Sequence, residues 1–203
     1  SFFRWASTSV ALLCLAFAHT AWADEALFGY TYGADTLPQG EVELQTAWTH
    51  RWNKGRGHFR ANELQTELEY GVTNRFTTSA YLLFLDINHR NAFPIEAASG
   101  DPLYPDRNGF FFRGAKLQFK YNILSPYLNN GWGLAAFLEP SYITRFRVDG
   151  SKTRQYEAEA GLIAQKNLLD DQLVLAYNFI AARERRVLVE DDNFVEHEWE
   201  FTN

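Results

Sequence analysis

Methionine, cysteine and long apolar runs are scarce in this sequence of 203 residues. There is no methionine even at position 1, so we expect the sequence to begin inside a longer reading frame. The mean hydropathy is slightly polar, at −0.32, which argues against a bundle of membrane helices. Basic residues are fewer than acidic ones, 19 against 25, and the formal net charge is −6. A nucleic-acid partner needs a basic stripe, so the charge argues against such a partner.

The N-terminus has the parts of a secretory signal peptide. Arg4 supplies the positive charge, residues 10–18 (VALLCLAFA) form a short apolar core, and residues 21–23 (AWA) give a small-x-small cleavage site. The apolar run is too short to cross a bilayer as a helix. We therefore predict a signal peptide at residues 1–23 and one exported domain at residues 24–203. A buried N-terminal helix is the weaker alternative.

Cleavage after Ala23 removes the only cysteine, Cys14, so the exported domain has no disulfide. Small secreted domains commonly depend on disulfides for stability. A chain of this size without them must be held together in another way, and a closed β-sheet provides one.

An alternation with a period of two residues runs through the rest of the chain. In ELQTELEY, residues 63–70, glutamate and glutamine at every second position alternate with leucine, threonine and tyrosine. This period is that of a strand with two different faces. We predict eight such strands, at about residues 41–52, 63–70, 76–85, 110–122, 132–142, 154–166, 173–181 and 195–201. No helical period of comparable length follows the signal peptide, so the predicted fold is all-β.

Alternation alone fits a soluble sandwich as well as a membrane barrel, but three features favour the barrel. Most predicted strands are about ten to thirteen residues long, whereas a strand that crosses a bilayer needs about nine to eleven and a typical globular strand has about five or six. The first, third, fifth and seventh connections are polar or extended, the second and sixth are tight, and the fourth is intermediate. Outer-membrane barrels have long external loops and short periplasmic turns, so the long connection at residues 86–109 is predicted to lie outside.

Aromatic side chains near the strand ends are the third feature. Such rings form two girdles at the membrane interfaces of a barrel. The predicted girdle residues are Trp48, Trp52, Tyr70, Tyr121, Trp132, Tyr142, Tyr156 and Trp199.

The opposite register carries charged residues that a lipid-facing surface would not tolerate, since one charge at mid-depth costs about 2–4 kcal/mol. The predicted lumen-facing residues are Glu43, Glu63, Glu67, Glu69, Lys116, Lys120, Glu139, Glu157 and Glu159. Arg113 would join them if its neighbours form a bulge. Two roles remain open: the charges pair across a narrow interior and fill it, or they line water and favour cations.

Four stretches carry a resemblance to a known family. FGYTYGADTLPQGEVELQTAWTHRW, EYGVTNRF, FRGAKLQFKYNILSPY and GLAAFLEPSY together resemble a largely uncharacterised family of bacterial outer-membrane β-barrels. That family is similar to the barrel proteins associated with meta-pathway phenol degradation and to porin-like transporters. The resemblance runs from about Phe28 to Phe201 and brings no catalytic or ligand residue. It implies ten to twelve strands, so we expect an antiparallel, up-and-down transmembrane β-barrel domain truncated at its C-terminus, with a closed eight-stranded barrel as the alternative.

The remaining side chains give no sign of an active site. The histidines are scattered, no serine lies in a nucleophile motif, and no acidic spacing repeats as a calcium loop would. We therefore predict no enzyme activity, no metal and no cofactor.

The expected protein is a passive channel or uptake protein for small solutes in the outer membrane of a Gram-negative bacterium. Its partners would be outer-membrane lipid, the barrel-insertion machinery and a small solute. The alternatives are a non-conducting structural barrel whose 86–109 loop contacts an external partner, and a lipid-modifying enzyme at the rim.

Overall fold

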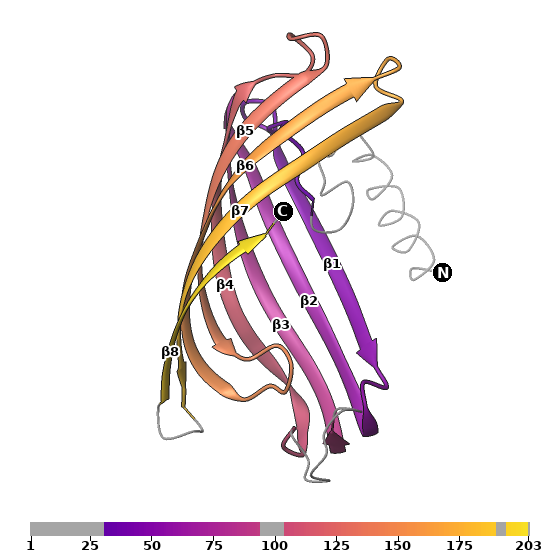
Figure 1. Ribbon diagram of the computed structural model, residues 1–203, viewed down its shortest axis with the longest axis vertical. Coiled ribbons are helices and arrows are strands. Elements are labelled where there is room, and N and C mark those ends of the chain that lie inside the picture. Colours follow the sequence, from indigo (N-terminus) through magenta and orange to yellow (C-terminus); the bar gives the residue numbers. More distant parts are fainter. Residues whose placement is uncertain (1–30, 94–103, 190–193, 203) are drawn as a thin grey trace, which may run out of the picture.

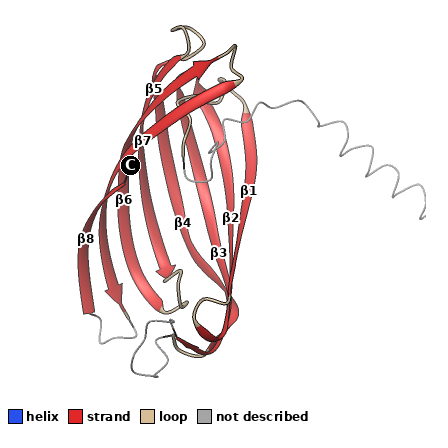
Figure 2. Cartoon of the chain, turned by 45° about the vertical axis from the view of Figure 1, so that its right-hand side comes forward, coloured by secondary structure: helices blue, strands red, loops and turns tan. Residues whose placement is uncertain are grey.

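The computed structural model describes residues 31–93, 104–189 and 194–202, so the predicted signal peptide lies outside the described residues. Eight strands follow one another: β1 (Val42–Trp52), β2 (Arg56–Thr73), β3 (Phe76–Phe93), β4 (Arg107–Leu124), β5 (Trp132–Arg145), β6 (Lys152–Leu168), β7 (Leu173–Leu188) and β8 (Phe194–Thr202). Each pairs antiparallel with the next, in the order β1 to β8. The described residues contain no helix (Figures 1 and 2). The predicted all-β, up-and-down antiparallel fold is confirmed.

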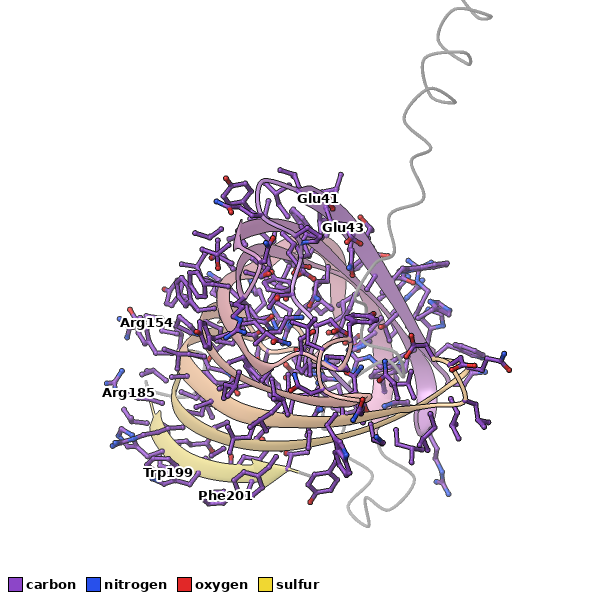
Figure 3. The ribbon with its side chains drawn as sticks, turned by 90° about the horizontal axis from the view of Figure 1, so that it is seen from above. Glu41, Glu43, Arg154, Arg185, Trp199 and Phe201 are labelled. Carbon is purple, nitrogen blue, oxygen red and sulfur yellow. The ribbon has the colours of Figure 1, made fainter. Side chains whose placement is uncertain are left out.

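The sheet is strongly curled, with a concave and a convex face (Figure 3). β1 and β8 are its two edges and do not pair with each other in the described part of the chain. The alternative of a closed eight-stranded barrel is therefore wrong for these strands. The described strands form an open, curved wall.

The alternation predicted from the sequence explains which side chains each face receives. On β2, Glu67 and Glu69 lie on the concave face, whereas Leu68 and Tyr70 are exposed on the convex face. The neighbouring strands keep this register, because Leu68 lies opposite Leu44 on β1 and Ala80 on β3. A slip of one residue would exchange the two faces of a strand, so the pattern fixes the pairing.

The strands other than β1 are longer than predicted, and the connections are correspondingly shorter. β2, β3 and β4 each have 18 residues. The third connection is residues 94–106 and not 86–109, because β3 continues to Phe93 and β4 begins at Arg107. The first connection is residues 53–55 only and is shorter than the fourth, residues 125–131. The fourth connection is also longer than the fifth, residues 146–151, and the seventh, residues 189–193, so of the four connections expected to be extended only the third is longer than the fourth, and the expected alternation of long and short connections is wrong at the other three.

A β-bulge in β4 turns Arg113 onto the concave face. Leu83 lies opposite Gly114 and Phe84 lies opposite Phe112, so Arg113 is the extra residue on β4. Bulges bend a strand and re-aim its side chains. Phe111, beyond the bulge, packs against the concave cluster that includes Leu85.

Three small apolar clusters lie on the concave face, one toward each end of the strands and a third, Tyr81, Leu83 and Ile143, between those two. Phe59, Ala61, Leu85, Ile87 and Ala92 are buried at the end that carries the β1–β2 and β5–β6 connections. Ala34, Ala135, Phe137 and Ile163 are buried at the end that carries the β2–β3 and β4–β5 connections. Charged and polar side chains surround these clusters, and this charged concave face is the candidate site.

Candidate functional site

The nine predicted lumen-facing residues all lie on the concave face, at neighbouring register positions of β1, β2, β4, β5 and β6. Their exposure differs. Glu69, Lys120 and Glu139 are buried, whereas Glu157 and Glu159 are partly exposed. The eight predicted girdle residues lie on the convex face and are exposed there, from 39% for Tyr142 to 70% for Trp48.

Glu139 is the centre of a paired cluster on the wall formed by β4 and β5. Lys116 Nζ lies 2.5 Å from Glu139 Oε1, and Gln118 Nε2 donates to Glu139 Oε2 at 3.1 Å. The Lys116 ammonium also lies 4.9 Å from the centre of the Tyr81 ring. The Glu139 side chain is 1% exposed, so its charge is compensated where water does not reach it. Here the charges fill the interior.

A second cluster surrounds Glu63 near the end of β1. Arg51 Nη2 lies 2.5 Å from Glu63 Oε1, Arg113 Nη1 lies 3.8 Å from Glu63 Oε2, and Arg147 Nε lies 3.9 Å from Glu63 Oε1. Arg51 Nη2 also donates to the Arg147 carbonyl oxygen at 2.6 Å. The β5–β6 connection, residues 146–151, thus reaches across the concave face to β1. Three guanidinium groups around one carboxylate give this end a positive excess.

Carboxylates oppose carboxylates elsewhere on the concave face. The cross-strand pairs of like charge are Glu43 with Glu69, Glu139 with Glu159, Glu157 with Glu184, and Glu184 with Glu198. Like charges directly opposite each other destabilise a sheet. Arg186 offsets part of this repulsion, since it lies 2.7 Å from Glu184 and 3.4 Å from Glu196. The Glu159 carboxylate has no salt bridge or hydrogen bond within the described residues. The β6–β8 side of the concave face therefore carries an excess of carboxylates.

The segment that precedes β1, residues 31–40, lies inside the curl at the end with the β2–β3 turn (Figure 1). Its backbone is held by side chains of the wall. Tyr32 N donates to Asn178 Oδ1 at 2.7 Å, and Leu37 N donates to Thr77 Oγ1 at 3.0 Å. Both backbone groups of Ala34 are bound: its N donates to Gln165 Oε1 at 2.7 Å, and its O accepts from Asn122 Nδ2 at 2.6 Å. Irregular backbone in a buried place needs such partners. The segment therefore connects β3, β4, β6 and β7 across the concave face.

Packing adds to these hydrogen bonds. Ala34 is fully buried, and the Tyr32 ring lies 5.2 Å from the Phe137 ring. A Cβ atom at Gly71 would overlap the Pro38 carbonyl oxygen, so the segment also lies directly against β2. Burial raises the pKa of the Tyr32 phenol above its usual range, and the nearby Glu139 carboxylate adds to that rise, so Tyr32 remains neutral.

The sequence did not predict this segment, and the signal for it was indirect. Thr77, Asn122, Gln165 and Asn178 are uncharged polar residues in the concave register, where the pattern offered them no partner. A row of amides at one end of the predicted strands was the available hint. Which backbone they would bind depends on the curl of the sheet, which alternation does not encode.

Two features are absent from the described residues. No group of three or more His, Cys, Asp or Glu side chains in residues 31–93, 104–189 and 194–202 could hold a metal ion. In the same part of the chain, no helix has the length and apolar character needed to cross a membrane.

Comparison with known proteins gives one match. No curated protein and no solved structure matches the chain. Residues 20–200 match a protein family described as "Family of unknown function (DUF6662)". The match covers most of the chain, including all eight strands up to the last residues of β8. The chain therefore belongs to the DUF6662 family of unknown function.

Proposed function

We propose that the chain forms the wall of an outer-membrane β-barrel that acts as a passive channel for small solutes. The observation that carries this proposal is a bounded apolar band on the convex face. On β3, the outward residues Leu82 and Phe84 give way to Asp86 and Asn88. On β7, the outward residues from Leu173 to Ala181 give way to Arg183 and Arg185.

The height of the band supports contact with lipid. The apolar run on β7 has about nine residues, which at about 3.3 Å per residue is about 30 Å long. At a strand tilt of about 35–45° the band would be about 21–25 Å tall, close to the apolar band of outer-membrane barrels. Leu162, Leu175 and Phe179 within it are about half exposed, and water would disfavour so many exposed apolar side chains in one belt. The resemblance to the phenol-degradation-associated barrels supports the same proposal.

The concave face supports a role in permeation. The opposed carboxylates of β6, β7 and β8 lower the stability of the sheet. A role in a water-filled path for cations accounts for their presence despite this cost. We propose cation preference at this side. Residues 31–40 and 146–151, which both enter the curl, favour the alternative of a structural barrel that does not conduct.

The first test is fractionation of cells that express the complete reading frame with its signal. The proposal expects the protein in the outer-membrane fraction, with gel migration that changes on boiling. A periplasmic protein with no heat-dependent shift would exclude the membrane placement.

The second test separates a channel from a structural barrel. The purified protein is inserted into planar bilayers, and the Glu157→Gln, Glu159→Gln variant is expected to lower the cation-to-anion permeability ratio about twofold. Glu41→Gln is the matched control, because Glu41 is an exposed residue before β1 and outside the opposed carboxylates. Absence of conductance in every sample would favour the structural barrel.

A further inference from the structure

The curved wall has a gap between β4 and β5. The β4–β5 ladder begins only at Gly114 and Ile143, so the part of β4 from Arg107 to Arg113 pairs with β3 alone. Thr144 partly replaces the missing ladder, since its hydroxyl lies 3.0 Å from the Phe112 carbonyl oxygen and 3.1 Å from that of Arg113. Beyond this contact β5 ends at Arg145, and no strand covers the open side of β4 in the described residues.

A hollow of about 740 Å³ lies at this gap. Its lining includes Phe110 and Phe112, which face the convex side, and Phe111 and Thr153, which belong to the concave side. In a continuous sheet, side chains of opposite faces cannot line one hollow, because the backbone separates them. The hollow is therefore an opening in the wall, and it is accessible from the convex face.

The lining combines aromatic rings with positive charge. Phe110 is 65% exposed and Phe112 is 49% exposed, and Tyr142 lies beside them. Arg145, Lys152 and Arg154 add three cations to the lining. The Arg145 guanidinium lies 4.4 Å from the centre of the Phe111 ring. This cation–π contact holds a positive charge beside an aromatic side chain of the lining.

We propose that this hollow binds a single-chain anionic amphiphile, a long-chain carboxylate, that enters from the surrounding membrane. Its chain lies against Phe110 and Phe112, and its carboxylate lies near Arg145, Lys152 and Arg154. The volume favours one chain over a lipid with several, since sites of about 300–1,000 Å³ hold one small molecule. The inference rests on the membrane placement of the proposed function and names a solute class for it.

The position of the hollow relative to the apolar band fits this ligand. Phe110 lies opposite Asp86 on β3, where the apolar band ends. Arg154 lies beyond Tyr156 on β6, and both Arg154 and Arg185 point away from the curl (Figure 3). A bound amphiphile would therefore have its chain at the level of the band and its charged group at the level where the band meets polar surface.

The test is photolabelling of the full protein in phosphatidylethanolamine vesicles. The probe is hexadecanoic acid with a terminal diazirine, and the comparison probe is the corresponding alcohol. The acid is expected to label peptides that contain residues 107–113 and 142–154 more than the alcohol does, as read by mass spectrometry. The Lys152→Glu, Arg154→Glu variant is expected to reduce labelling by the acid about fivefold. Arg185→Glu is the matched control, because Arg185 is a convex cation on the next strand and does not line the hollow.

Equal labelling by acid and alcohol, or labelling by the acid that the double charge reversal does not change, would overturn the proposed site. Because the vesicles are prepared independently of the location in the cell, this result is separate from fractionation. Selective labelling of a protein that does not reach the outer membrane would support the site and reject the proposed function.

Discussion

Glu139 and Glu159 face each other on neighbouring strands, yet their surroundings differ. Glu139 is compensated by Lys116 and Gln118, whereas Glu159 has no salt bridge within the described residues. The two roles that the sequence left open for the glutamates therefore occur on different parts of one face. Charges on the β4–β5 wall fill space, and the carboxylates of β6, β7 and β8 remain in excess.

At the residue scale, we predict that Glu139→Gln lowers the free energy of unfolding by about 3 kcal/mol, because it leaves the Lys116 ammonium without its buried partner. Urea unfolding of the protein in lipid vesicles measures this change. Glu196→Gln is the control, since Glu196 is 43% exposed in its pair with Arg186 and its loss should cost about 0.5 kcal/mol. Equal losses in the two variants would mean that burial does not distinguish the two pairs.

Two irregular elements enter the curl, one toward each end. Residues 31–40 are held by amide and hydroxyl side chains of four strands, and residues 146–151 reach β1 through Arg147. Each element is held by a few polar contacts and not by a ladder. Elements held in this way open at lower cost than paired strands do.

At the element scale, loosening residues 31–40 should widen a path through the protein. We predict that Gln165→Ala, Asn178→Ala raises single-channel conductance in planar bilayers, because it removes the acceptors of Ala34 N and Tyr32 N. The two side chains make four hydrogen bonds with residues 32–35, each worth about 1 kcal/mol, so their loss makes opening of the segment more frequent. Gln155→Ala is the control, since Gln155 is a concave glutamine of β6 that bonds Glu184 and not this segment. If both variants conduct alike, residues 31–40 do not restrict passage.

The whole molecule is an open curved wall with an apolar convex band and a charged concave face. Within residues 31–93, 104–189 and 194–202, its two edges, β1 and β8, have unpaired backbone groups along one side. Such groups are costly in lipid, so a wall in a membrane requires partners for both edges. The band and the open edges together support the proposed barrel wall.

At the scale of the whole molecule, a lysine on the convex face distinguishes lipid from water. We predict that Leu162→Lys, within the band, lowers the free energy of unfolding in vesicles by about 2–4 kcal/mol, whereas Asn88→Lys, beyond it, costs about 0–1 kcal/mol. Leu162 is 52% exposed, so in water the same change would be nearly neutral. Urea unfolding of the two variants distinguishes the cases: a larger loss for Leu162→Lys than for Asn88→Lys indicates contact with lipid, and two small losses indicate contact with water.

The sequence by itself determined the all-β fold, the antiparallel order and the face on which each strand places its glutamates. It could do so because a period of two residues fixes the facing of a strand without reference to distant residues. The positions of Glu67 and Leu68, and the turn at residues 74–75, were predictable for this reason.

Only the tertiary structure decided the strand ends, the bulge at Arg113, the burial of residues 31–40 and the gap beside Phe110. These depend on how far the sheet curls and on contacts between residues more than a hundred positions apart, such as Ala34 with Gln165. Local alternation is the same in a flat and in a curled sheet, so it contains no information about what the curl encloses.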